Sequence, residues 1–209
     1  MTFFEVLVEG ASDVPKMREI MTRKFNLTES QDFRIHPHHG KGRLPDNIEA
    51  RPDPNQRTLL HQLPAKLKGY SHCGDDICVL VVVDVDETPC YDLLQRLNGM
   101  LGNLSKRPRK VLFRLVIEET ESWFLADHEA VRRAFPKADT RKIARITPDA
   151  IVGAWEELAG AIGISRTSVT GADKFSWAEK IAPHMNLETP ISPSLRKLIS
   201  GIQSQMEID

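Results

Sequence analysis

Acidic side chains follow two of the strands that the sequence predicts, at the point where each strand ends. Glu9 comes directly after the apolar segment 3–8, and Asp84 and Asp86 close the most apolar segment of the chain. Ligands bind beyond the carboxyl ends of the strands in open α/β sheets, so we expect these carboxylates to meet at one edge. Carboxylates brought together repel one another unless a cation neutralises them, and Mg²⁺ or Mn²⁺ prefers such hard oxygen ligands. The pattern therefore predicts a divalent metal site made of Glu9, Asp84 and Asp86.

The spacing within the D-x-D segment adds to this prediction. In an extended strand, Asp84 and Asp86 point to the same side while Val85 points to the other, so one ion could contact both carboxylates. A further group of acids follows the last predicted strand: Glu118, Glu119 and Glu121. A single acid at a strand end often only caps a helix, but the E-G-x-S-D and D-x-D segments place acids where turns would accept Asn, Ser or Gly equally well.

Strands and helices alternate in the part of the chain that carries these acids. The predicted strands are 3–8, 33–38, 77–85 and 111–118, and amphipathic helices follow the first three of them. The β-branched run 77–85 is typical of a strand buried on both faces, so it should be central. This order predicts an α/β fold with an open, mainly parallel sheet of about four strands and flanking helices.

The strand pattern ends at about residue 120. Helical periodicity then dominates, around 121–135, 149–162, 174–185 and 194–204. We therefore expect an α/β domain over residues 1–120, with residues 121–209 forming a helical cap or flank packed on the same domain. The tryptophans, at helical positions with apolar neighbours, are expected in the core: Trp123, Trp155 and Trp177.

The bulk composition limits the partners of the chain. Its 209 residues carry a formal net charge of -1, which gives no global attraction to nucleic acid, so binding would depend on metal ions or on the basic segments 36–43 and 105–110. No apolar run approaches the roughly 20 residues that span a bilayer, and no signal-peptide pattern opens the chain, so we expect a cytoplasmic protein without a membrane segment. Three cysteines without a C-x-x-C pair argue against a disulfide framework.

The segment HPHHGKGR at 36–43 contains histidines and two cations between glycines. The histidines His36, His38 and His39 lack the spaced second pair of ligands that a closed zinc site needs. Lys41 and Arg43 are better placed to bind phosphate, because glycine lets backbone N–H groups approach an anion.

Two motifs, taken in this order, resemble the Toprim domain shared by topoisomerases, primases and the OLD-type nucleases. They are VEGASD at 8–13 and VVVDVDE at 81–87. The resemblance implies that Glu9, Asp84 and Asp86 hold catalytic divalent metals and that Asp13 plays an outer role in the metal site. Segments 36–42 (HPHHGKG) and 121–127 (ESWFLAD) are similar to those of a group of small bacterial Toprim-like proteins, so the likeness extends over most of the chain.

The same resemblance suggests further site residues. Glu121 and Asp127 would complete a second metal position, as in two-metal sites with ions roughly 4 Å apart. Lys174, in the segment VTGADKF, resembles a lysine of the OLD-type nucleases and would neutralise the transition-state phosphorane. Asp127 could equally cap the following helix, and Lys174 could be an ordinary lysine in the first turn of a helix.

Two other functions use the same residues. The segment VVVDVDET also resembles haloacid-dehalogenase-like phosphatases, in which Asp84 would be the nucleophile and Asp86 a general acid/base. That motif normally opens its domain, whereas here it follows two βα units, and Glu9 would be left unexplained. The third candidate is a non-catalytic module that binds a partner such as a separate ATPase.

A metal-dependent nuclease is the function that the pattern favours. Nucleic acid is its expected substrate, and a separate ATPase is a candidate partner in defence or DNA repair. The chain has no G-x-x-x-x-G-K-[ST] loop of its own. The oligomeric state stays open.

Overall fold

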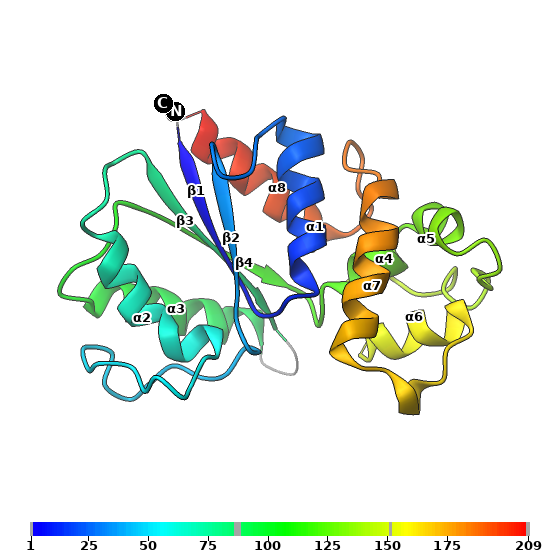
Figure 1. Ribbon diagram of the computed structural model, residues 1–209, viewed down its shortest axis with the longest axis horizontal. Helices are drawn as coiled ribbons and strands as arrows, with labels where there is room; N and C mark the ends of the chain where they lie inside the picture. The colour runs from blue at the N-terminus through cyan, green and yellow to red at the C-terminus, as the bar shows by residue number, and fades with distance from the viewer. Residues whose placement is uncertain (1, 86–88, 151, 208–209) are drawn as a thin grey trace.

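The computed structural model describes residues 2–85, 89–150 and 152–207, and its strands form one parallel sheet (Figure 1). The strands are β1 (Phe3–Val8), β2 (Phe33–Pro37), β3 (Ile77–Asp84) and β4 (Lys110–Val116). Their order is β2-β1-β3-β4, and every neighbouring pair is parallel. The predicted open parallel α/β fold is confirmed.

The register aligns the carboxyl ends of the two interior strands. Leu7 of β1 lies opposite His36 of β2 and Val81 of β3, and Asp84 lies opposite Val116 of β4. Since both β1 and β3 are flanked by strands and covered by helices, their apolar runs are almost wholly buried. The acids that follow them therefore emerge side by side from the core.

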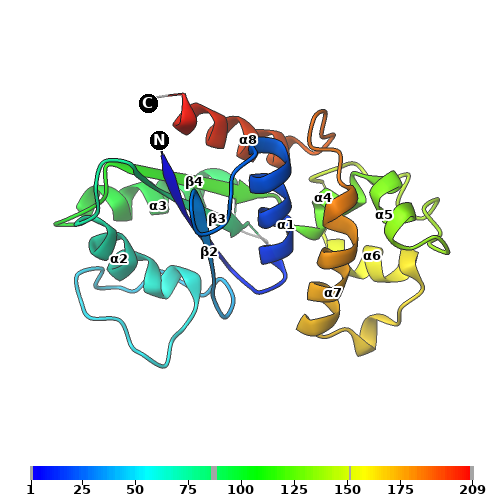
Figure 2. The ribbon, with the colours of Figure 1, turned by 45° about the horizontal axis from the view of Figure 1, so that its top comes forward.

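One face of the sheet is covered by α2 (Leu59–Tyr70) and α3 (Cys90–Asn103), as Figures 1 and 2 show. The helices pack their leucines on the strand side chains that point to this side. The resulting core includes Leu7, Val79, Val81, Val83, Leu63 and Leu97.

The opposite face is covered by α1 (Asp13–Glu19), which continues into a π-helical turn (Ile20–Lys24), and by α8 (Pro193–Met206). Helix α8 packs along β4, so the end of the chain returns to the sheet. There the Thr2 hydroxyl donates a hydrogen bond to the carbonyl of Gln205 at 3.2 Å. The region after residue 120 therefore both extends the molecule and completes the covering of the sheet.

The remaining helices lie together beside the sheet (Figure 1). They are α4 (Glu121–Leu125), α5 (His128–Ala134), α6 (Ala154–Ile162) and α7 (Gly171–Ile181), with short 3-10 turns at Arg166–Ser168 and Ala182–His184. One continuous hydrophobic core joins this group to the α1 face of the sheet, since Val8, Trp123 and Leu158 belong to it together. Within the described residues, no helix is long and apolar enough to cross a membrane.

Two of the differences from the predicted boundaries bear on the acids of the site. The helix expected over 121–135 is divided into α4 and α5 near Asp127, whose side chain accepts the backbone N–H of Ala130 at the start of α5. Strand β4 ends at Val116 because the backbone turns at Glu118, which has a φ of 63°. That glutamate accepts the N–H groups of Gly153 and Ala154 at the start of α6.

Candidate functional site

A cavity of about 210 Å³ opens at the carboxyl ends of β1 and β3. Its walls come from the ends of these strands, the start of α1, the loop after β2, the start of α4 and the first turn of α7. The lining residues are Glu9, Gly10, Ser12, Asp13, Gly40, Asp84, Glu119, Thr120, Glu121 and Lys174. The structure thus brings together acids that are far apart in the sequence, at the edge of the sheet where they were expected.

Glu9 and Asp84 are joined directly. The Glu9 carboxylate accepts a hydrogen bond from the backbone N–H of Asp84 at 2.8 Å. Because this bond uses the Asp84 backbone, the Asp84 carboxylate is left to face the other acids of the cavity.

Burial and neighbouring charge act on Asp84 in the same direction. Burial raises its pKa well above the usual value, and the carboxylates of Asp13, Glu9 and Glu121 raise it further, while the Lys16 ammonium opposes them. An ionised Asp84 is therefore costly unless a further cation lies close to it. The side chain should hold either a proton or a metal ion.

A buried network lies under the same cavity, around Lys16. This side chain has no solvent exposure, and its Nζ donates to Thr120 Oγ1 and, at 2.9 Å, to Glu121 Oε1. The Thr120 hydroxyl in turn donates to Asp13 Oδ1 at 2.8 Å, and Lys16 Nζ is 3.5 Å from the same oxygen. The lysine therefore ties helix α1 to the start of α4.

The charges of Lys16 and Glu121 stabilise each other. Burial alone would raise the pKa of Glu121, but the ammonium groups of Lys16 and Lys174 hold it below its usual value. Burial would lower the pKa of Lys16, yet Glu121 and Asp13 raise it overall. Both side chains thus remain charged in a nearly dry environment.

Lys174 reaches the cavity from the first turn of α7. Its Nζ lies 4.8 Å from the centre of the Trp155 ring and 3.4 Å from Glu119 Oε1. Burial raises the pKa of Glu119 to about 7, with Lys174 opposing and Glu121 and Glu118 adding to the rise. The stacking on Trp155 and the contact with Glu119 hold the ammonium at the cavity wall.

Neither of the proposed phosphate-binding residues of the loop after β2 lines the cavity. Lys41 Nζ donates to the Val85 carbonyl at 3.0 Å, directly after β3, and Arg43 is exposed. The N–H of Gly40 donates to the Glu9 carbonyl at 2.8 Å, so it fixes the loop and does not face an anion. The second basic segment, 105–110, precedes and begins β4 and therefore lies at the opposite end of the sheet.

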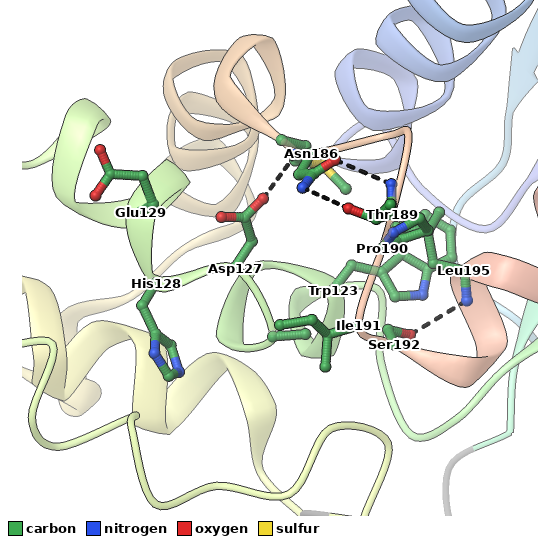
Figure 3. Close-up of a pocket in the computed structure, with 12 residues that line it drawn as sticks. Trp123, Asp127, His128, Glu129, Asn186, Thr189, Pro190, Ile191, Ser192 and Leu195 are labelled. Atoms are coloured by element: carbon green, nitrogen blue, oxygen red, sulfur yellow. Dashed lines mark hydrogen bonds between the residues drawn. The ribbon is translucent and has the colours of Figure 1, made fainter.

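Asp127 is not brought into the acidic cavity. Its Oδ1 accepts the N–H of Ala130 at 3.0 Å and its Oδ2 accepts the N–H of Asn186 at 2.7 Å, as Figure 3 shows for the second bond. It lines a separate pocket of about 420 Å³ between α5 and the segment before α8. The position fits the helix-cap alternative, in which both oxygens serve the fold.

Of the predicted metal ligands, Glu9, Asp13, Asp84 and Glu121 line the same cavity, and Asp127 does not. Within residues 2–85, 89–150 and 152–207, no three His, Cys, Asp or Glu side chains are arranged to hold a metal ion together. Glu9 and Asp84 share the cavity, and Asp86 lies outside the described residues. Asp13 and Glu121 are bonded to Thr120 and Lys16.

Two residues around the site, Lys16 and Thr120, were not singled out from the sequence. Glu119 was noted among the acids after the last strand but was given no role. Asp13 and Lys16 share one helical stripe with Met17 and Ile20, both of which are buried, so helical spacing was the available signal.

The chain is similar in structure to the C-terminal region of the OLD protein of Xanthomonas campestris pv. campestris. One solved structure of that region has a TM-score of 0.54 and 12% sequence identity, and the match covers 100% of this chain and 97% of that chain. A second has a TM-score of 0.53 and 12% identity, covering 100% and 98%. At this identity the likeness shows a shared fold and not a shared activity.

Comparisons of the sequence identify a family but no activity. A family model described as "Domain of unknown function (DUF4276)" matches residues 8–203. No curated protein matches the chain.

Proposed function

Since this chain belongs to the DUF4276 family, a domain of unknown function, its activity must be inferred from its own cavity, and we propose that it is an Mg²⁺- or Mn²⁺-dependent nuclease of Toprim type. One observation carries this proposal: Glu9 and Asp84, from adjacent strand ends, share a cavity with the Lys174 ammonium. The fold shared with the OLD region agrees with the motif resemblance to OLD-type nucleases.

The described carboxylates suit a hard divalent cation. Mg²⁺ is commonly bound by one or two carboxylates, with waters and substrate phosphate oxygens filling its remaining positions. Glu9 and Asp84 supply two such groups, and the raised pKa of Asp84, caused by burial and neighbouring acids, indicates a place where positive charge is favoured. Asp86 belongs to the proposed ligand set by its spacing from Asp84.

When bound, the ion would polarise the phosphodiester and lower the pKa of an attacking water. The residues of the chain would bind and orient the substrate. Lys174, held by Trp155 and Glu119, would place a positive charge where the phosphorane develops negative charge. Lys41, fixed at the end of β3 by the Val85 carbonyl, would attract a neighbouring phosphate of the same strand.

Nucleic acid is the substrate class that this chemistry requires, and the cytoplasm is the proposed location. The net charge of -1 provides little general attraction to a long duplex. A separate ATPase is the proposed partner, and it or a second copy of the chain would supply additional basic surface.

The activity is tested by nicking of plasmid DNA and cleavage of RNA in the presence of Mg²⁺ or Mn²⁺. We expect cleavage by the wild type and a loss of about 100-fold or more in Glu9→Gln and Asp84→Asn. Glu129→Gln is the matched control, because Glu129 is an exposed acid of α5 outside this cavity.

Three results would contradict the proposal. The first is equal cleavage by all four proteins, and the second is no cleavage by the wild type with its candidate ATPase present. The third is a phosphoenzyme trapped on Asp84 during phosphatase turnover, which would favour the haloacid-dehalogenase-like phosphatase.

A further inference from the structure

The buried ammonium of Lys16 lies between two acids of the cavity, one of which, Glu121, was assigned to a second metal position by the family resemblance. It contacts Asp13 and Glu121, which come from the starts of α1 and α4 and whose carboxylates line the same cavity as Glu9 and Asp84. The inference drawn from this position rests on the proposed function, since it concerns how many divalent ions that site takes.

The donors of Lys16 are matched by oxygen acceptors. An ammonium has three N–H donors, and among the described residues its Nζ lies near Thr120 Oγ1, Glu121 Oε1 at 2.9 Å and Asp13 Oδ1 at 3.5 Å. The side chain is fully buried, and its Nζ also lies 5.3 Å from the centre of the Phe124 ring. Lys16 therefore cannot move into solvent without opening the contact between α1 and α4.

Asp13 has both oxygens engaged within the protein. Oδ1 accepts the Thr120 hydroxyl at 2.8 Å, and Oδ2 accepts the backbone N–H of Gly10 at 3.0 Å. A metal ion at this carboxylate would have to share oxygens that already accept these bonds, and it would lie close to a positive ammonium. Repulsion between two cations in a buried environment makes that arrangement costly.

We propose that Lys16 takes the place of a second divalent cation, so that each chain binds one divalent ion, at Glu9 and Asp84, while Asp13 and Glu121 bind the lysine instead. A two-metal site uses its second ion to offset charge on the second group of acids and on the reacting phosphate. Here a permanent single charge offsets that group of acids. Lys16 is then a positioning residue that fixes Glu121, Thr120 and Asp13 at the wall of the cavity.

The number of Mn²⁺ ions bound per chain tests this proposal independently of activity. Isothermal titration calorimetry of the metal-free full chain with Mn²⁺ gives the stoichiometry, and electron paramagnetic resonance detects spin coupling between paired Mn²⁺ ions. We expect one Mn²⁺ per chain and no coupling in the wild type. Glu9→Gln should weaken binding about tenfold or more, whereas Glu121→Gln, which keeps an oxygen acceptor for Lys16, should change the Kd less than about threefold.

A second test looks for an additional Mn²⁺ ion bound by a variant without the lysine. Lys16→Met removes the ammonium and leaves Asp13 and Glu121 without their cation, so we expect a second Mn²⁺ to bind this variant where it folds. If Lys16→Met does not fold, the Mn²⁺ stoichiometry and Kd of the wild type and Glu121→Gln test the proposal.

The failures of the two proposals are distinct. Two Mn²⁺ ions in the wild type, with one lost in Glu121→Gln, would overturn the role of Lys16 and leave the nuclease proposal standing. A single ion that is lost in Glu121→Gln but retained in Glu9→Gln would overturn it as well. No Mn²⁺ binding would overturn both the single-ion count and the metal site of the proposed nuclease.

Discussion

The carboxylate of Glu9 accepts the backbone N–H of Asp84 at 2.8 Å, so that a side chain of the candidate site joins the ends of β1 and β3. The same carboxylate contributes to the raised pKa of Asp84. Glu9 therefore stabilises the strand ends through its hydrogen bond and destabilises them through its charge. The two effects can be separated by substitution.

Glu9→Gln keeps an oxygen acceptor for the Asp84 N–H and removes the negative charge. In EDTA we expect its Tm to exceed that of the wild type by about 2–4 °C, which corresponds to about 1 kcal/mol for a chain of this size. Added Mn²⁺ should raise the Tm of the wild type more than that of Glu9→Gln, because the ion stabilises the folded state that it binds and binds the variant more weakly.

Glu9→Ala is the control for this experiment, since it removes both the charge and the acceptor. Its Tm should fall below that of Glu9→Gln by differential scanning calorimetry. An equal Mn²⁺-induced rise in Tm for wild type and Glu9→Gln would show that Glu9 does not bind the ion.

Lys174 is expected to act on the reaction and not on metal binding. It stacks on Trp155 and contacts Glu119 at the wall of the cavity. Lys174→Met should lower kcat for plasmid nicking by about 100-fold, as expected for loss of a charge that stabilises the transition state. Lys174→Arg keeps the charge and the stacking and should retain more activity. Unchanged kcat in Lys174→Met would assign the lysine to the fold alone.

The Lys16 and Glu121 pair should show strong coupling in stability. Lys16→Met leaves a buried Glu121 charge, so its free energy of unfolding should fall by about 3–5 kcal/mol. In Lys16→Met/Glu121→Gln both charges are absent, and the loss should be smaller than in Lys16→Met alone. Urea unfolding of the wild type, both single variants and the double variant measures the coupling. Additive losses would mean that the two side chains do not stabilise each other.

The fold was predictable because its signals are local and repeated. The β-branched run at 77–85 is typical of a strand buried on both faces. The alternation of strands with amphipathic helices predicts a parallel sheet. Glu9 and Asp84 followed from this, since parallel strands end at the same edge.

The second group of acids was harder to predict because its surroundings depend on tertiary contacts. A lysine in a helix is usually read as exposed, and nothing local to Lys16 indicates that Thr120 and Glu121, more than 100 positions away, cover it. Asp127 was assigned to the site by the family resemblance, with a helix cap as the alternative, but the break between α4 and α5 directs its carboxylate to the N–H groups of Ala130 and Asn186.

Asp127 should therefore contribute to stability. Asp127→Ala removes the cap of α5 and the bond to the Asn186 N–H, and we expect the free energy of unfolding to fall by about 1–2 kcal/mol. The Mn²⁺ stoichiometry and Kd should stay as in the wild type. Asp127→Asn, which retains one acceptor oxygen, should lose less stability than Asp127→Ala. Loss of a bound Mn²⁺ in Asp127→Ala with unchanged stability would restore Asp127 as a metal ligand.

His38 should make the stability of the protein depend on pH. Its side chain is buried beside the end of β1, Nδ1 lies 2.8 Å from the Val8 carbonyl, and Nε2 has no hydrogen-bond partner within the described structure. Burial lowers its pKa below the usual 6.5, the charges of Lys66 and His36 add to this, and the Val8 carbonyl opposes it. The folded protein therefore keeps the ring neutral at a pH where the unfolded chain protonates it.

The sign of the effect follows from proton binding. Above a pH of about 6.5 neither state binds the proton and the stability is complete; as the pH falls toward the lowered folded pKa, the unfolded chain gains the proton and the free energy of unfolding decreases. The slope for one proton is at most about 1.4 kcal/mol per pH unit.

Urea unfolding at about pH 7.5, 6.5 and 5.5 measures this slope. His38→Asn is the control, because an asparagine amide can still donate to the Val8 carbonyl but does not titrate. Between about pH 6.5 and pH 5.5 the free energy of unfolding should fall more in the wild type than in His38→Asn. Parallel pH profiles for the two proteins would exclude His38 as the titrating group.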